Sequence, residues 1–156
     1  MAKKEKPTIN VEKYKGSCEK LEEKFSNTRK QWSDEIRSLT AKLSKVKEFA
    51  DAQAQCLSDR QELVEEMSNL RVKLYKQKMS YEEHESALFR YYILDYDMKM
   101  SNTDVRTHIK SDLAQLEYLI NLITNQIDFY TETIKTLDNY NFAIKNRIQV
   151  VSESLV

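Results

Sequence analysis

Glycine and proline are nearly absent from this sequence of 156 residues, which contains one of each. Because these two residues supply most tight turns and helix breaks, their scarcity predicts few and long helices. Charged residues make up 32% and apolar residues 40%, a balance that suits helices burying one stripe and exposing the rest to water. The sequence therefore predicts an all-α protein with a narrow core.

Cysteine and histidine are also scarce, with two of each. Cys18 and Cys56 are expected on one long helix, where a rise of ~1.5 Å per residue separates them by roughly 57 Å, too far for a disulfide. His84 and His108 have no cysteine at a zinc-binding spacing. We therefore expect free thiols in a reducing compartment, no metal and no cofactor.

Long apolar runs and glycine-rich loops are missing as well. No window approaches the about 18 apolar residues that a membrane span needs, so we expect a cytoplasmic protein. Gly16 alone cannot form a loop that cradles phosphates. Asp95 and Asp97 are placed like the start of a calcium loop, but Met100 stands where that loop needs Gly and Arg106 where it needs Glu. The sequence therefore predicts no enzyme, although two of its 25 acidic residues could still meet in space.

The first two thirds of the chain show apolar residues at alternating steps of three and four, the spacing of coiled-coil helices. Residues 1–8 are expected to form a disordered basic tail, and a long N-terminal helical region follows over 9–100. Ser80 and Glu83 have the spacing of a capping box, which predicts a possible helix break near 79–81.

The last third contains the most regular pattern. Turn-prone residues over 95–103 predict a connection, and Ser101 with Asp104 approximates the capping spacing at the start of a helix over 101–156. The apolar stripe of that helix has one polar exception, Asn141, at a position that can fix register and subunit number. Its isoleucines and the apolar residues beside it favour more than two helices in contact. We thus expect a long helical hairpin with a C-terminal coiled-coil oligomerisation helix. The residues of that stripe are Leu113, Leu116, Ile120, Ile123, Ile127, Tyr130, Ile134, Leu137, Asn141, Ile144 and Ile148.

Basic side chains and tyrosines occur together in one part of the chain. Residues 71–78 hold four cations and no acid, and one more cation and a tyrosine pair follow. Cations neutralise phosphates while aromatic rings stack on unpaired bases, so the pattern predicts single-stranded DNA binding that assembly of several copies would strengthen. The candidate DNA-binding residues are Arg71, Lys73, Lys76, Lys78, Arg90, Tyr91 and Tyr92.

Two alternatives use the same residues differently. In the first, the cations only solvate a helix surface, and the chain is a structural coiled-coil component of a virion or scaffold without DNA binding. In the second, the chain is a helical adaptor that binds a partner protein through the stripe from Leu63 to Leu74.

The segment from Asp112 to Lys145 resembles the C-terminal helix of the UvsY family of phage recombination mediators. The matching residues are Asp112, Asp128-Phe129 and Phe142-Ala143-Ile144-Lys145, and the Tyr91-Tyr92 pair after a basic helix is similar to the family's arrangement. This chain departs from the pattern in its longer N-terminal helix and in having Ile93-Leu-Asp-Tyr-Asp97 where the family has a loop with Gly and Asp.

The resemblance implies a ring-like homo-oligomer, a heptamer in the family, without ATPase activity. It implies that the ring binds single-stranded DNA and helps load a RecA-like recombinase onto strands covered by single-strand-binding protein. The location that it implies is the cytoplasm of a phage-infected host cell.

Overall fold

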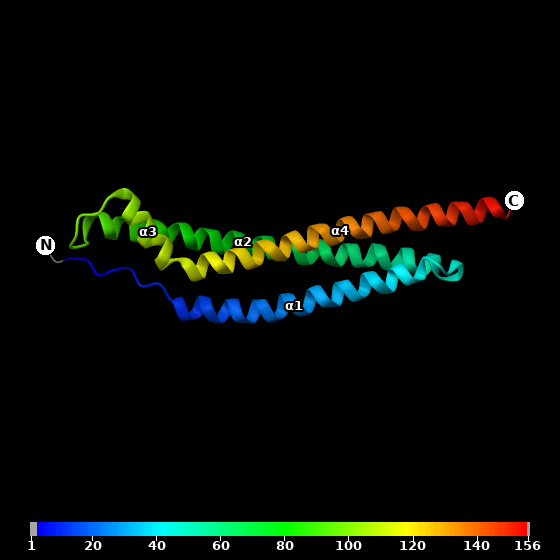
Figure 1. Cartoon of the computed structure of the whole chain (residues 1–156), viewed down its shortest axis with the longest axis horizontal. Coiled ribbons are helices and arrows are strands. Elements are labelled where there is room, and N and C mark those ends of the chain that lie inside the picture. The colour runs from blue at the N-terminus through cyan, green and yellow to red at the C-terminus, as the bar shows by residue number, and fades with distance from the viewer. Residues whose placement is uncertain (1–2, 156) are drawn as a thin grey trace. The chain divides into compact units, whose positions relative to one another are not determined.

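The computed structural model describes residues 3–155, which form helices and no strand. In chain order (Figure 1) the elements are α1 (Val11–Lys42), the short 3-10 helix η1 (Val46–Glu48), α2 (Phe49–Leu94), α3 (Asn102–Asp112) and α4 (Ala114–Ser154). The predicted all-α fold is confirmed. The helices contribute to two compact units, Met1–Glu22 with Val72–Thr124 and Glu23–Arg71 with Asn125–Val156.

Two helix starts are fixed by side-chain caps. The backbone N–H of Lys13 donates to Asn10 Oδ1 at 3.0 Å, and the backbone N–H of Asp104 donates to Ser101 Oγ at 3.2 Å. Such caps satisfy N–H groups that the first turn of a helix leaves without a partner. The start of α3 directly after Ser101 confirms the predicted cap, whereas the sequence analysis did not single out Asn10.

The chain reverses between α1 and α2 without glycine or proline (Figure 1). Ser44 Oγ donates to the backbone of the last turn of α1 at 3.1 Å, and Arg147 in α4 donates to the Leu43 carbonyl oxygen at 2.8 Å. These donors satisfy carbonyl groups that a helix end leaves unpaired. The expectation that Cys18 and Cys56 share one continuous helix is therefore wrong, and both are buried free thiols on different helices.

Two other helix boundaries differ from the predicted ones. Helix α2 runs without a break through 79–81, because Ser80 is tolerated inside a helix whose Tyr81 and Leu88 pack against the core. The single helix predicted over 101–156 is divided at Leu113, whose φ of −102° and ψ of 10° end α3 before α4 begins. No glycine or proline stands at this break. Leu113 is fully buried, so the break coincides with packing of its side chain in the core.

The first unit has a core of apolar side chains from α2, α3 and the junction before α4. Its buried members are Leu88, Tyr92, Val105, Ile109 and Leu113. Residues 3–10 form no helix but contact this unit, since Ile9 packs against the cluster and Lys6 Nζ lies 3.0 Å from Asp112 Oδ1. These contacts differ from the disordered tail predicted over 1–8, of which residues 1–2 lie outside the described part.

The second unit packs the C-terminal part of α1 and the N-terminal part of α2 against most of α4. The Tyr140 hydroxyl donates to the Leu39 carbonyl oxygen at 2.7 Å, and the Cys56 thiol donates to that of Leu137 at 3.3 Å. Leu39, Cys56, Leu137 and Tyr140 are all buried, so α4 closes the core of this unit from within the same chain.

Candidate nucleic-acid interface

The cations predicted to contact DNA are all exposed, but they belong to two different units of the chain. Lys73, Lys76 and Lys78 lie on α2 in the first unit with Arg90 further along the helix, while Arg71 belongs to the second unit. Within residues 3–155 none of these side chains takes part in an ion pair. Their charges are therefore available to neutralise phosphates, which is the main source of affinity for nucleic acids.

An exposed tyrosine stands among the lysines of the first unit. With 3.6 residues per turn, Tyr75 lies about 100° around α2 from Lys76 and about 60° from Lys78. The Tyr75 side chain is 66% exposed. An accessible ring between cations is the arrangement that stacks on unpaired bases while phosphates are held beside it. The sequence analysis missed Tyr75, although its place inside the basic segment was a usable signal.

The predicted tyrosine pair has a structural role instead. Tyr92 is only 5% exposed, and its hydroxyl donates to Asp112 Oδ2 at 2.5 Å. Burial, followed by the hydrogen bond to Asp112, raises the pKa of Tyr92, while Lys6 lies 5.5 Å from its ring centroid. Tyr91 is half-buried and packs edge-on against Tyr92 and Tyr96. The ring of Tyr92 is thus not accessible to a base in this conformation, and only part of Tyr91 is.

A groove of about 920 Å³ lies beside Arg90 in the first unit. Its lining residues include Tyr81, Glu85, Phe89, Ile93, Arg106, Ile109, Lys110 and Glu117. The lining thus combines an apolar part with cations from α3 and with two carboxylates. Burial, with smaller effects from the two carboxylates, raises the pKa of Tyr81, so its phenol stays neutral.

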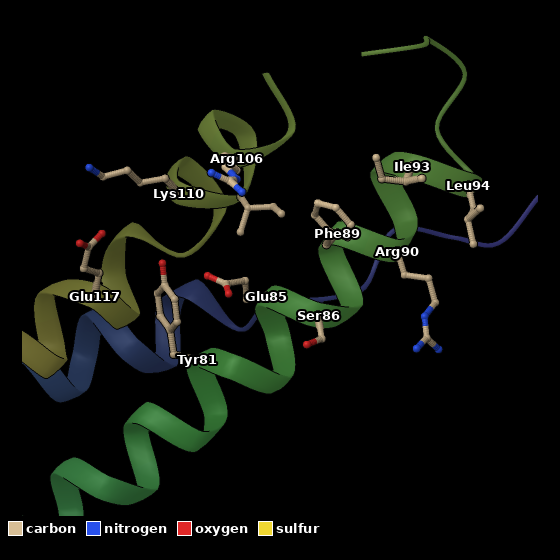
Figure 2. A pocket seen from close by; sticks show the side chains of 11 residues that line it. Tyr81, Glu85, Ser86, Phe89, Arg90, Ile93, Leu94, Arg106, Lys110 and Glu117 are labelled. Atoms are coloured by element: carbon tan, nitrogen blue, oxygen red, sulfur yellow. The ribbon is translucent and has the colours of Figure 1, made fainter. Parts of the chain in front are cut away.

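Figure 2 shows how the side chains of this groove are directed. Phe89 and Ile93 point toward α3, which carries Arg106 and Lys110, whereas Arg90 points away from these two cations. Because the groove contains carboxylates and because Arg90 is turned from it, these cations form no continuous track for a phosphate backbone. We therefore place the candidate DNA contacts on the lysines of α2.

The C-terminal stripe is buried inside the chain. Among the predicted oligomerisation residues, Leu113, Leu116, Ile123, Ile127, Tyr130, Ile134, Leu137 and Ile144 are buried, and Ile120, Asn141 and Ile148 are half-buried. In each unit the stripe packs against helices of the same chain, as the contact between Cys18 Sγ and the Gln115 carbonyl oxygen illustrates. The regular spacing is therefore accounted for without a second copy, and oligomerisation stays a prediction.

Two acidic residues do meet in the second unit. Asp59 is 4% exposed and accepts a hydrogen bond from Gln55 Nε2 at 2.7 Å. A hydrogen bond to Asp59, together with burial and the charge of Asp59, raises the pKa of Glu35. The Glu35 carboxyl group is therefore more easily protonated than an ordinary glutamate. In the described residues no group of three or more His, Cys, Asp or Glu is placed to hold a metal ion.

Comparison with known proteins gives no match, either to a protein-family model, to a curated protein or to a solved structure. Residues 3–155 also contain no helix with the length and apolar character that crossing a bilayer requires. The candidate function therefore depends on the charges, exposure and contacts of the residues described above.

Proposed function

We propose that this chain binds single-stranded DNA through the lysines of α2 and acts, as an oligomer, as a recombination mediator. The observation that carries the DNA-binding part is the exposed ring of Tyr75 between Lys76 and Lys78, with Lys73 further around α2. The charges of these three lysines have no ion-pair partner in the described chain. Phosphates would contact the ammonium groups while a base stacks on the tyrosine ring.

A surface of this size predicts weak binding by one copy. For a single strand, the slope of the logarithm of the binding constant against the logarithm of the salt concentration is about −0.7 for each phosphate that a cation neutralises. Three lysines therefore give a slope of about −2. Stacking of one base on Tyr75 adds roughly 1–3 kcal/mol. Several linked copies would multiply these contacts on one strand, which is why an oligomer suits the proposed role.

The recombination role rests on the resemblance of residues 112–145 to the UvsY family. On that basis the partners would be a RecA-like recombinase and single-strand-binding protein, and the oligomer would hold DNA while the recombinase is loaded. The chain itself would hydrolyse no nucleotide. The DNA-binding part stands apart from this resemblance, because it is supported by residues of α2.

Fluorescence anisotropy of a labelled thymidine oligonucleotide, titrated with the full chain at several salt concentrations, tests the DNA-binding part. We expect salt-sensitive binding that is weakened when Lys73→Ala and Lys76→Ala are combined. The matched control combines Lys13→Ala with Lys20→Ala, which removes two exposed lysines of α1 and should leave the affinity unchanged.

Two outcomes would contradict the proposal. Absence of binding at low salt would remove DNA from the function and favour the structural coiled-coil alternative. An equal loss of affinity in the α1 control would show that net charge, rather than this surface of α2, determines binding.

A further inference from the structure

Helix α2 carries a second apolar stripe on the side away from its buried one. The stripe consists of Val72, Tyr75, Met79, Phe89 and Ile93, all of them exposed. With Glu82 and Ser86 included, the steps alternate between three and four, which is the spacing of a coiled-coil seam. All of these residues lie in the first unit. Phe89 and Ile93 also line the groove beside α3, whereas Val72, Tyr75 and Met79 are not among its lining residues. A partly exposed apolar seam of this kind indicates a surface for another helix.

The residues beside the stripe are charged in an ordered way. With Val72 at heptad position a, Lys76 and Glu83 occupy e positions, and Lys78 and Glu85 occupy g positions. All four side chains are exposed, and none forms an ion pair within residues 3–155. Arg90 occupies the next e position, so the flanks are basic at Lys76 and Lys78, acidic at Glu83 and Glu85, and basic again at Arg90.

This order of charges fits an identical stripe that runs in the opposite direction. In an antiparallel helix pair e positions face e positions and g positions face g positions. Lys76 then faces the partner's Glu83, and Lys78 faces the partner's Glu85. Because a two-fold axis repeats each contact, the helix pair contains four such ion pairs, and Arg90 lies outside them.

The seam positions favour the same direction. In the antiparallel register Val72 faces the partner's Phe89, and Met79 faces the partner's Glu82. A parallel pair would instead place Glu82 against the partner's Glu82, with two like charges next to each other in the seam. The antiparallel register avoids that repulsion by placing each Glu82 beside the partner's Met79, and it keeps the apolar contact between Val72 and the partner's Phe89.

We propose that the exposed stripe of α2 binds the same stripe of a second copy in this antiparallel register. A stripe of 22 residues at ~1.5 Å rise is about 33 Å long and, with a helix about 10 Å wide, limits the contact to a few hundred Å² per copy. Contacts of this size belong to weak and reversible complexes. This two-fold contact joins two copies.

The pairing also bears on the proposed DNA binding, and this part rests on that proposed function. The partner's Glu83 and Glu85 lie where phosphates would contact Lys76 and Lys78, and Tyr75 becomes part of the seam. The paired form is therefore a DNA-free form, and single-stranded DNA and the second copy compete for one surface of α2. The oligomer of the proposed function would join its copies through a surface other than this stripe.

Sedimentation velocity of the full chain without DNA, over a wide concentration range, tests the pairing. We expect a concentration-dependent dimer that Lys76→Glu or Glu83→Lys alone weakens by about tenfold or more, because each change places like charges opposite each other twice per dimer. An equimolar mixture of the two variants should regain the dimer. Lys13→Glu on α1 is the matched control and should not change the dimer.

A wild-type chain that stays monomeric at all concentrations would overturn the pairing. So would a mixture of Lys76→Glu and Glu83→Lys that associates no better than either variant alone. Since all three positions are exposed, circular dichroism should show the same helix content in every variant, which separates lost pairing from lost folding.

A second measurement adds a thymidine oligonucleotide to the wild-type dimer. We expect a DNA complex that lacks this two-fold pair, and tighter DNA binding by Glu83→Lys than by the wild type. A DNA complex that retains the dimer would overturn the competition but leave the pairing intact. A chain that dimerises but binds no DNA would refute the proposed function alone.

Discussion

Replacing Ile127 by Asp distinguishes an internal stripe of α4 from an intermolecular one. Ile127 is 8% exposed within the single chain. The change loses roughly 1.5–3 kcal/mol of apolar burial and adds roughly 1–3 kcal/mol for a buried polar group without a partner. For a chain of this size 1 kcal/mol corresponds to about 2–4 °C, so we expect the melting temperature to fall by roughly 10–20 °C.

The assay is thermal unfolding followed by circular dichroism at two protein concentrations, with light scattering for the mass. An internal stripe predicts a loss of melting temperature that is the same at both concentrations. Phe142→Asp is the matched control on the same helix, because Phe142 is 68% exposed and should lose no more than about 1 kcal/mol. A variant with an unchanged melting temperature and a smaller mass would refute the reasoning and restore this stripe as an oligomer contact.

Three further perturbations test local features. Glu35→Gln should stabilise the second unit. The pKa of Glu35 is raised beside Asp59, so the charged carboxylate is less favourable in the folded than in the unfolded chain, and this costs stability at pH values above the ordinary pKa of 4.5. The gain in melting temperature should thus be present at neutral pH and absent well below pH 4.5, and a gain that does not depend on pH would contradict a raised pKa of Glu35. Ser101→Ala should cost about 1 kcal/mol in urea unfolding by removing the cap of α3, whereas Ser101→Asp should retain it. Tyr75→Ala should lower single-stranded DNA affinity by roughly 5–150-fold, measured below the concentration at which the chain dimerises, and an unchanged affinity would exclude stacking on this ring.

The helical class was predictable because it depends on composition and local spacing. One glycine and one proline leave few places where a helix must stop, and the Ser101 cap is a local signal that needs no tertiary contact. The reversal after α1 was not predictable in this way. The carbonyl groups at this reversal accept hydrogen bonds from Ser44 and from the distant Arg147. The spacing of residues within α1 gives no information about a contact with Arg147.

The candidate site was predicted in part for a related reason. Periodicity indicates which residues are buried but not what covers them, so the stripe of α4 was interpreted as a contact between copies, while the structure buries it within one chain. Similarly, a tyrosine beside cations gives the same sequence pattern whether its ring packs in the core or is free to stack on a base. Tyr92 lies four residues after Leu88 and shares its buried side, whereas Tyr75 lies on the exposed side of α2.

Glu82 gives the strongest test of which stripe joins copies, because it is the charged residue of the seam on α2. In the antiparallel register it faces the partner's Met79, and each dimer contains two such contacts. Replacing both carboxylates by leucine gains at least about 1 kcal/mol per site, so Glu82→Leu should tighten the dimer by about 30-fold.

Sedimentation equilibrium of Glu82→Leu against wild type measures that gain, and Glu12→Leu on α1 adds the same apolar group at an exposed position outside the stripe. If both variants self-associate alike, general hydrophobicity rather than a specific seam is responsible. A discrete dimer that appears only with Glu82→Leu, and that Lys76→Glu weakens again, requires the seam and its flanking charges to act in one register. That combination would place this two-fold contact on α2, while the buried stripe of α4 completes the core of each copy.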